Sequence, residues 1–117
     1  PGASRQGTRD LASGDLKFSG NSMRVKRTHL LYHGTLLYDF PLQQISKLLK
    51  PPPREPEYRL GRRHEQFVQN LDATAEQLTQ ALIDAWQPTS TMTAWPREEV
   101  QRLVKERYSQ SSWNYRH

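Results

Sequence analysis

Short runs of strand-forming residues, separated by clusters of small polar residues, mark the start of the chain. Residues 1–9 are small and polar and predict a loop. Asp10–Ala12 and Leu16–Phe18 flank the turn signal Ser13-Gly14-Asp15, which predicts a β-hairpin. The polar run at residues 19–22 predicts the end of the second strand, so we expect Lys17 to lie at the edge of a turn.

The next apolar run, Thr28–Leu37, is rich in β-formers. It is too continuously apolar for a half-exposed strand, so it predicts a strand buried on both faces. Phe67-Val68 with Leu71 predicts a short buried turn or strand. The weak alternation at Thr89–Thr93 predicts an edge strand.

Three segments carry helical signals. Pro41 opens the first, which must end near Lys50 because Pro51–Pro53 cannot continue it. The second begins at a capping box formed by Thr74 and Gln77 and stops before Pro88. The third begins at Pro96. These elements predict an α/β or α+β fold in which residues 50–63 form a proline- and charge-rich loop, either a functional or docking loop or a disordered one.

The composition suggests a domain that does not complete its own core. Hydrophobic residues make up 34% of the 117 residues, and the mean hydropathy is −0.92. Burial has to offset roughly 1–2 kcal/mol of backbone entropy for each ordered residue. Because the apolar residues are patterned, we expect a folded piece that needs a partner segment rather than a disordered chain.

The net charge of +5 favours anionic partners such as nucleotide phosphates, nucleic acid or an acidic protein surface, although a basic surface also serves solubility alone. The absence of cysteine excludes a disulfide, a thiolate zinc site and a cysteine nucleophile within this chain. No apolar run approaches the roughly 20 residues of a membrane span. We therefore expect a soluble cytoplasmic protein without a membrane partner.

Lys17 is the first candidate for chemistry. An ammonium beside a glycine-containing turn, here Ser19-Gly20-Asn21, can approach a carboxylate or phosphate closely, with backbone N–H groups as further donors. The alternative is an ordinary solvated surface lysine.

Other polar residues offer weaker signals. His33, beside Gly34 and Thr35, fits a base or ligand and equally a structural histidine. The four histidines show no metal-ligand spacing, so no protein-bound metal is expected. Asp10 and Asp15 fit either a contact to a nucleotide-bound Mg²⁺ or simple turn formation.

Two basic stretches, Arg24–Arg27 and Arg62-Arg63, are candidates for phosphate contact or plain solvated surface. They lack the interleaved aromatic residues that stack on bases, so nucleic acid is not the expected partner.

Taken in order, these motifs resemble the lipoate-protein ligase family of the biotin/lipoate A/B protein ligase superfamily. The likeness runs from about Thr8 to Tyr115. The matching segments are, in order, Asp10-Leu11, Lys17-Phe18-Ser19-Gly20-Asn21-Ser22, His33-Gly34-Thr35-Leu36-Leu37, Asn70-Leu71 and residues 108–115.

The resemblance implies an activity that uses ATP and Mg²⁺ to convert lipoate to lipoyl-adenylate. The lipoyl group then passes to a lysine of an acceptor, which is a lipoyl domain of a 2-oxoacid dehydrogenase or the H protein of the glycine cleavage system. Lys17 would be the catalytic lysine that contacts the acyl-adenylate, and Asp10 a nucleotide or Mg²⁺ contact. The implied adenylate-binding residues are Ser19, Gly20, Asn21, His33, Gly34 and Thr35.

The chain departs from the family pattern at several positions, among them Leu16, where the family usually has a basic residue, and Ser22-Met23, where it has Ala-Gln. Arg9 stands where the family has Asn before Asp10, and nothing in residues 1–16 matches the family's glycine-rich lipoate-binding segment. Residues 1–117 therefore resemble the C-terminal portion of the catalytic domain, without its N-terminal half, and we expect no lipoate activation by this chain alone. Two alternatives stay open: an octanoyl- or lipoyltransferase of the same superfamily, acting on octanoate or lipoate, and a non-enzymatic basic interaction module.

Overall fold

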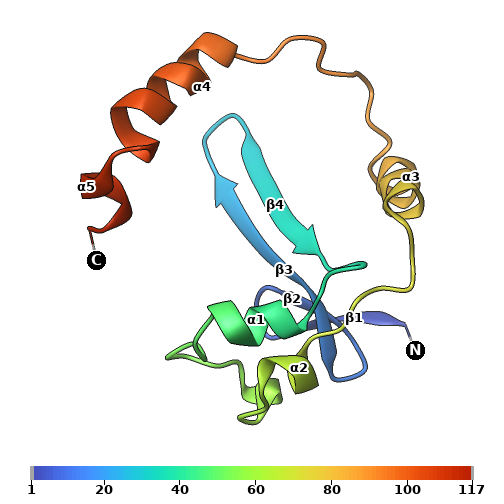
Figure 1. Cartoon of the computed structure of the whole chain (residues 1–117). Coiled ribbons are helices and arrows are strands. Elements are labelled where there is room, and N and C mark those ends of the chain that lie inside the picture. Colours follow the sequence, from blue (N-terminus) through green and yellow to red (C-terminus); the bar gives the residue numbers. More distant parts are fainter. Residues whose placement is uncertain (1, 117) are drawn as a thin grey trace. The chain divides into compact units, whose positions relative to one another are not determined.

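Four antiparallel strands in the order β1-β2-β3-β4 form the sheet of this structure, a computed structural model that describes residues 2–116 (Figure 1). The chain divides into two units with a boundary between Leu82 and Ile83, and the sheet belongs to the first. The fold is a mixed α+β one, as predicted. The strands are β1 Ala3–Gln6, β2 Asp10–Ser13, β3 Leu16–Val25 and β4 Leu30–Leu36.

The predicted hairpin joins β2 to β3. Ser13 pairs with Leu16, so Gly14 and Asp15 alone make the turn. Gly14 has a φ of 57°, the left-handed conformation that such tight hairpin turns require and that glycine adopts without strain. The hairpin prediction is therefore confirmed.

Three strand predictions are wrong. The expected loop at residues 1–9 contains β1, because its polar side chains need no burial on an edge strand. The expected stop at residues 19–22 is absent, and β3 continues to Val25 because β4 pairs with it along that length. Thr89–Thr93 forms no strand, since a short run without a partner strand has no backbone hydrogen bonds to hold it.

β4 is a strand as predicted, but it is not buried on both faces. Leu30 and Leu31 are each 57% exposed and Tyr32 is 46% exposed. Among residues 2–116, β4 is the last strand of the sheet, and with β3 it forms a ribbon that extends beyond β1 and β2 (Figure 1). An apolar run predicts that a strand is covered by other side chains, but it does not indicate which segment covers it.

A bulge in β3 lies beside Lys17, whose backbone contacts the segment that follows Phe67. Leu11 pairs with Ser19 and Ala12 with Lys17, so Phe18 is an extra residue on β3. The carbonyl of Lys17 accepts a hydrogen bond of 2.9 Å from the backbone N–H of Gln69. The predicted buried segment after Phe67 is thereby fixed against the start of β3.

Short helices complete the first unit, and they pack over a small core. They are α1 Gln43–Leu48, the 3-10 helix η1 Glu57–Arg59 and α2 His64–Phe67. The buried side chains are Ala12, Phe18, Ser19, Arg59 and Phe67, each at most 4% exposed. Helix α1 ends before the three prolines, as predicted.

Helix α3, Ala75–Trp86, begins in the first unit with the predicted capping box. Gln77 Oε1 accepts from the Thr74 N–H at 2.9 Å, and Thr74 Oγ1 accepts from the Gln77 N–H at 3.3 Å. It ends at Gln87, which is left-handed and precedes Pro88.

The second unit begins within α3 and contains α4 Arg97–Leu103, the π-helical turn η2 Val104–Tyr108 and α5 Ser111–Asn114. The predicted helix after Pro96 is confirmed. The guanidinium carbons of Arg107 and Arg116 lie 3.7 and 3.3 Å from the centre of the Trp113 ring, which ties the end of the unit together. Among residues 2–116, no helix has both the length and the hydrophobicity needed to cross a bilayer.

Candidate functional site

Lys17 lies within β3 beside the bulge, and not at a turn as the sequence suggested. Its Nζ is 2.8 Å from Oδ1 of Asp10 on the neighbouring strand, and the two side chains are 27% and 13% exposed. Two of the sequence-predicted residues are thus in direct contact. The ammonium has three donors, so the pair with Asp10 leaves capacity for another anion at a position that solvent still reaches.

Gly20 leaves room for this ammonium. Gly20 pairs with Asp10 across the strands, and a Cβ added to it would lie 3.4 Å from Lys17 Nζ. A methyl group at this position would therefore be in van der Waals contact with the end of the lysine side chain. The glycine keeps one side of the ammonium open.

Tyr58 is a third member of this cluster that sequence reasoning missed. It comes from η1 in the proline-rich loop, and its hydroxyl donates to Asp10 Oδ2 at 2.8 Å. Its ring lies against Phe67, with 5.1 Å between the ring centres. The pKa of the Tyr58 hydroxyl is raised, chiefly because the side chain is partly buried. The hydrogen bond to the Asp10 carboxylate and the negative charge of that group raise it further.

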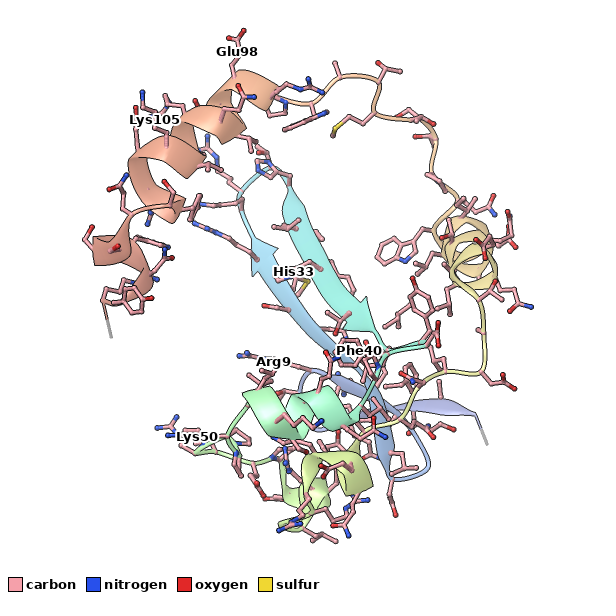
Figure 2. The ribbon with its side chains drawn as sticks, viewed as in Figure 1. Arg9, His33, Phe40, Lys50, Glu98 and Lys105 are labelled. Atoms are coloured by element: carbon pink, nitrogen blue, oxygen red, sulfur yellow. The ribbon has the colours of Figure 1, made fainter. Side chains whose placement is uncertain are left out.

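Strand register shows which other predicted residues share the face of Lys17. Gly20 pairs with Thr35 and Ser22 with His33, and directly paired residues point to the same side of a sheet. Thr35 and His33 therefore lie on the same face as Asp10 and Lys17. Figure 2 shows His33 on β4, where its side chain is exposed.

The remaining predicted residues lie on the opposite face. Asn21 pairs with Gly34, and its amide donates to Ser19 Oγ at 3.0 Å and to the Arg9 carbonyl at 2.9 Å. A Cβ on Gly34 would collide with Asn21 Oδ1. The two strands thus approach closely here, and the Asn21 amide is held by two hydrogen bonds.

A cavity of about 410 Å³ lies beside Asn21, at the ends of β2 and β3. Arg9, which precedes β2 (Figure 2), contributes to its wall. Its lining includes Arg5, Arg9, Asn21, Met23 and Tyr32, and it also includes Asp10, the partner of Lys17. Asp10 therefore belongs both to the Lys17 cluster and to the wall of this cavity.

Arg62, which the sequence offered as a phosphate contact or a solvated residue, is hydrogen-bonded to backbone carbonyls. Its Nη2 donates to the carbonyls of Tyr58 and Asp15 at 2.7 and 3.1 Å, and its Nε donates to the Arg59 carbonyl at 3.0 Å. These bonds fasten the proline-rich loop to the β2–β3 turn. The loop that carries Tyr58 is therefore ordered, which favours the functional-loop reading of residues 50–63.

The described residues do not form a metal site of their own. No group of three or more His, Asp and Glu residues gathers anywhere in residues 2–116. Both carboxylate oxygens of Asp10 are engaged, one by Lys17 and one by Tyr58. The Asp10 carboxylate is thus bonded to two protein groups in this geometry, and its predicted contact to a nucleotide-bound Mg²⁺ stays a prediction.

We expect Tyr58→Phe to reduce the loss of unfolding free energy that the first unit shows as the pH becomes alkaline. A tyrosine whose pKa is raised by folding holds its proton more tightly in the folded state, so its contribution to stability is present below the ordinary pKa of 10.0 and declines as the pH rises above it. Urea unfolding between pH 8 and about pH 11 should show a smaller decline for the variant than for the wild type. Equal declines would contradict the assigned hydrogen bond.

The chain has recognisable relatives. Residues 1–88 match the family model of the lipoyl protein ligase A/B catalytic domain. The fold is similar to a crystal structure of lipoate-protein ligase A bound with ATP, with a TM-score of 0.70 and 22% sequence identity. The match covers 90% of this chain and 43% of that protein, so the chain spans less than half of its length. None of the curated proteins matches the chain significantly.

Proposed function

Because the chain belongs to the lipoyl protein ligase A/B catalytic domain family, we propose that it supplies the lysine-bearing part of a lipoyl-adenylate site. The observation that carries the proposal is the Lys17–Asp10 pair, held by Tyr58 on one side and left open at Gly20 on the other. A lysine fixed in this way is suited to an anion that forms during a reaction.

The reaction would proceed in two steps. A carboxylate oxygen of lipoate attacks the α-phosphorus of ATP, pyrophosphate leaves, and lipoyl-adenylate forms. The ε-amine of an acceptor lysine then attacks the acyl carbon, giving an amide and AMP. In both steps negative charge gathers on the oxygens around the acyl phosphate, and the Lys17 ammonium would stabilise it.

ATP enters this proposal as a Mg²⁺ complex. Mg²⁺ bound to a nucleotide takes most of its ligands from phosphate oxygens and water, so it does not require a carboxylate cluster on the protein. Asp10 would serve to orient Lys17 instead, since both of its oxygens already have partners.

The exposed ribbon of β3 and β4 supports a requirement for a second polypeptide segment. The side chains of Met23 and Val25 on β3, and of Leu30, Leu31 and Tyr32 on β4, are all between 46 and 67% exposed. An apolar strand at the edge of a sheet is a ready template for another strand. We infer that the family's N-terminal half covers this ribbon and completes the site.

Lipoate ligation is favoured here over acyl transfer through a cysteine thioester. The chain contains no cysteine, so a transferase reaction of that kind would need a thiol from outside it. The acceptor would be a lipoyl domain or the H protein of the glycine cleavage system.

An adenylate-formation assay tests the proposal. The N-terminal half of lipoate-protein ligase A, produced as a separate polypeptide, is mixed with this chain, lipoate and ATP, and lipoyl-AMP is measured. We expect lipoyl-AMP from the mixture and none from either polypeptide alone. Turnover by this chain alone would refute the need for a second segment.

The same preparation separates the ligase from a basic interaction module. Binding of single- or double-stranded DNA that weakens steeply with salt, with no lipoyl-AMP from the mixture, would favour the module instead.

A further inference from the structure

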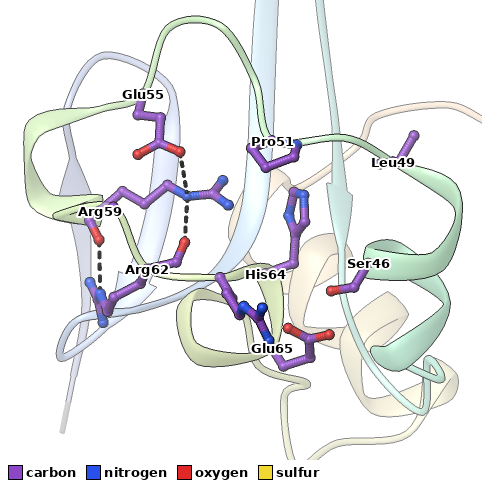
Figure 3. Close-up of a pocket in the computed structure, with 10 residues that line it drawn as sticks. Ser46, Leu49, Pro51, Glu55, Arg59, Arg62, His64 and Glu65 are labelled. Atoms are coloured by element: carbon purple, nitrogen blue, oxygen red, sulfur yellow. Dashed lines mark hydrogen bonds and ion pairs between the residues drawn. The ribbon is translucent and has the colours of Figure 1, made fainter.

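A second cavity, of about 360 Å³, lies between the end of α1 and the proline-rich loop (Figure 3). We call it the Arg59 cavity. The residues that matter for its chemistry are Leu49, Pro51, Glu55, Arg59, Arg63 and His64. It shares no lining residue with the Lys17–Asp10–Tyr58 cluster. Its volume falls within the range of small-molecule sites, roughly 300–1,000 Å³.

Arg59 is an unusual residue for a cavity wall because its side chain is only 5% exposed. Its Nε contacts Glu55 Oε1 at 3.3 Å and donates to the Arg62 carbonyl at 3.0 Å, and its guanidinium lies 4.8 Å from the Phe67 ring centre. Within residues 2–116, this ion pair and this hydrogen bond both use Nε, which leaves the two terminal Nη atoms available. Figure 3 shows the guanidinium pointing toward His64.

His64 offers an unsatisfied group at the same place. Its Nε2 is buried and has no hydrogen-bond partner among the described residues. A buried polar atom without a partner costs on the order of 1–3 kcal/mol, so such atoms are few in folded proteins. A buried His64 nitrogen without a protein partner, beside a guanidinium whose outer nitrogens are available, indicates that a ligand with an acceptor group fits here.

The charges of the wall favour an anion. Arg59, Arg62 and Arg63 face two carboxylates, Glu55 and Glu65, which leaves an excess of one positive charge with His64 neutral. Glu55 already has a charged partner. Glu55 pairs with Arg59, and the neighbouring Ser46 hydroxyl and then the Glu65 backbone amide lower the pKa of the Glu65 carboxyl.

We propose that the Arg59 cavity binds a small organic anion with a carboxylate or phosphate head. The planar Arg59 guanidinium binds the head through its Nη atoms, and His64 Nε2–H donates to the same head group. Leu49 and Pro51 contact the apolar body of the ligand. The site is separate from the proposed lipoyl-adenylate site and does not depend on it.

A titration of the 117-residue chain tests this site, with the ring protons of His64 followed by NMR at constant ionic strength. Butyrate probes the carboxylate head and inorganic phosphate the phosphate head. We expect saturable shifts of the His64 signals with at least one probe, while the signals of the exposed His29 stay in place as an internal reference. Shifts at His64 no larger than at His29 would overturn the proposal.

Variants locate the binding. Arg59→Met keeps the packing on Phe67 and removes the guanidinium, so it should weaken binding about tenfold or more. Arg54→Met, which removes an exposed arginine of the same loop, should leave affinity within about twofold. Equal affinity for Arg59→Met and the wild type would contradict the site, and if Arg59→Met does not fold, the wild-type titration decides.

Discussion

Lys17→Ala is expected to slow lipoyl-adenylate formation roughly 10²–10³-fold in the assay with the N-terminal half of lipoate-protein ligase A, the range seen when one fixed donor to a developing oxyanion is removed. The reason is that Asp10 and Tyr58 hold the ammonium in place before the substrate binds, so its interaction with the acyl phosphate requires no reorganisation. Initial rates of pyrophosphate release measure the effect.

Lys47→Ala is the matched control for this change. Lys47 lies in the last turn of α1 and is exposed, so its removal should leave the rate within about twofold of the wild type. The melting temperature of each variant shows whether the fold is intact. A rate for Lys17→Ala within threefold of the wild type, about 0.7 kcal/mol, would remove Lys17 from the chemistry.

Gly34→Ala is expected to have the largest effect on stability among simple substitutions in the sheet. The added Cβ would collide with Asn21 Oδ1 and lie 2.9 Å from the carbonyl oxygen of Gly20. Asn21 cannot move away freely because its amide is bonded to Arg9 and Ser19, and the Gly20 oxygen belongs to the backbone. Overpacking of this kind costs about 1–3 kcal/mol, or a fall in Tm on the order of 10 °C.

Gly2→Ala is the comparison for that measurement, since a Cβ on Gly2 would meet nothing within 4 Å. Thermal unfolding followed by circular dichroism should show Gly2→Ala within about 2 °C of the wild type. Equal melting temperatures for the two variants would contradict the close approach of β3 and β4 at Gly34.

The helices were predictable because their signals are local. The capping box at Thr74 and Gln77 is formed by two hydrogen bonds between residues three positions apart. The prolines at 51–53 prevent α1 from continuing because proline has no backbone N–H and its ring clashes with the preceding helical turn. The exposure of β4 was not predictable, because an apolar strand looks the same in the sequence whether its cover comes from this unit or from elsewhere.

Only part of the candidate site could be predicted from the sequence. Lys17 and Asp10 were both named, but Tyr58 lies 48 positions from Asp10 and no local pattern joins them. The bulge at Phe18, which puts Lys17 beside Asp10, likewise depends on how two strands pair. The strand register also places the side chains of Asn21 and Lys17 on opposite faces of the sheet. This placement depends on how the strands pair and cannot be predicted from neighbouring residues in the sequence.

The location of a bound lipoyl-adenylate tests the central claim most directly, measured in a crystal structure of the chain with the N-terminal half of lipoate-protein ligase A. The account predicts that Lys17 Nζ lies within hydrogen-bond distance of an oxygen of the acyl phosphate, on the sheet face shared with Thr35 and His33. An adenylate bound in the cavity beside Asn21, with Lys17 paired only to Asp10, would contradict it.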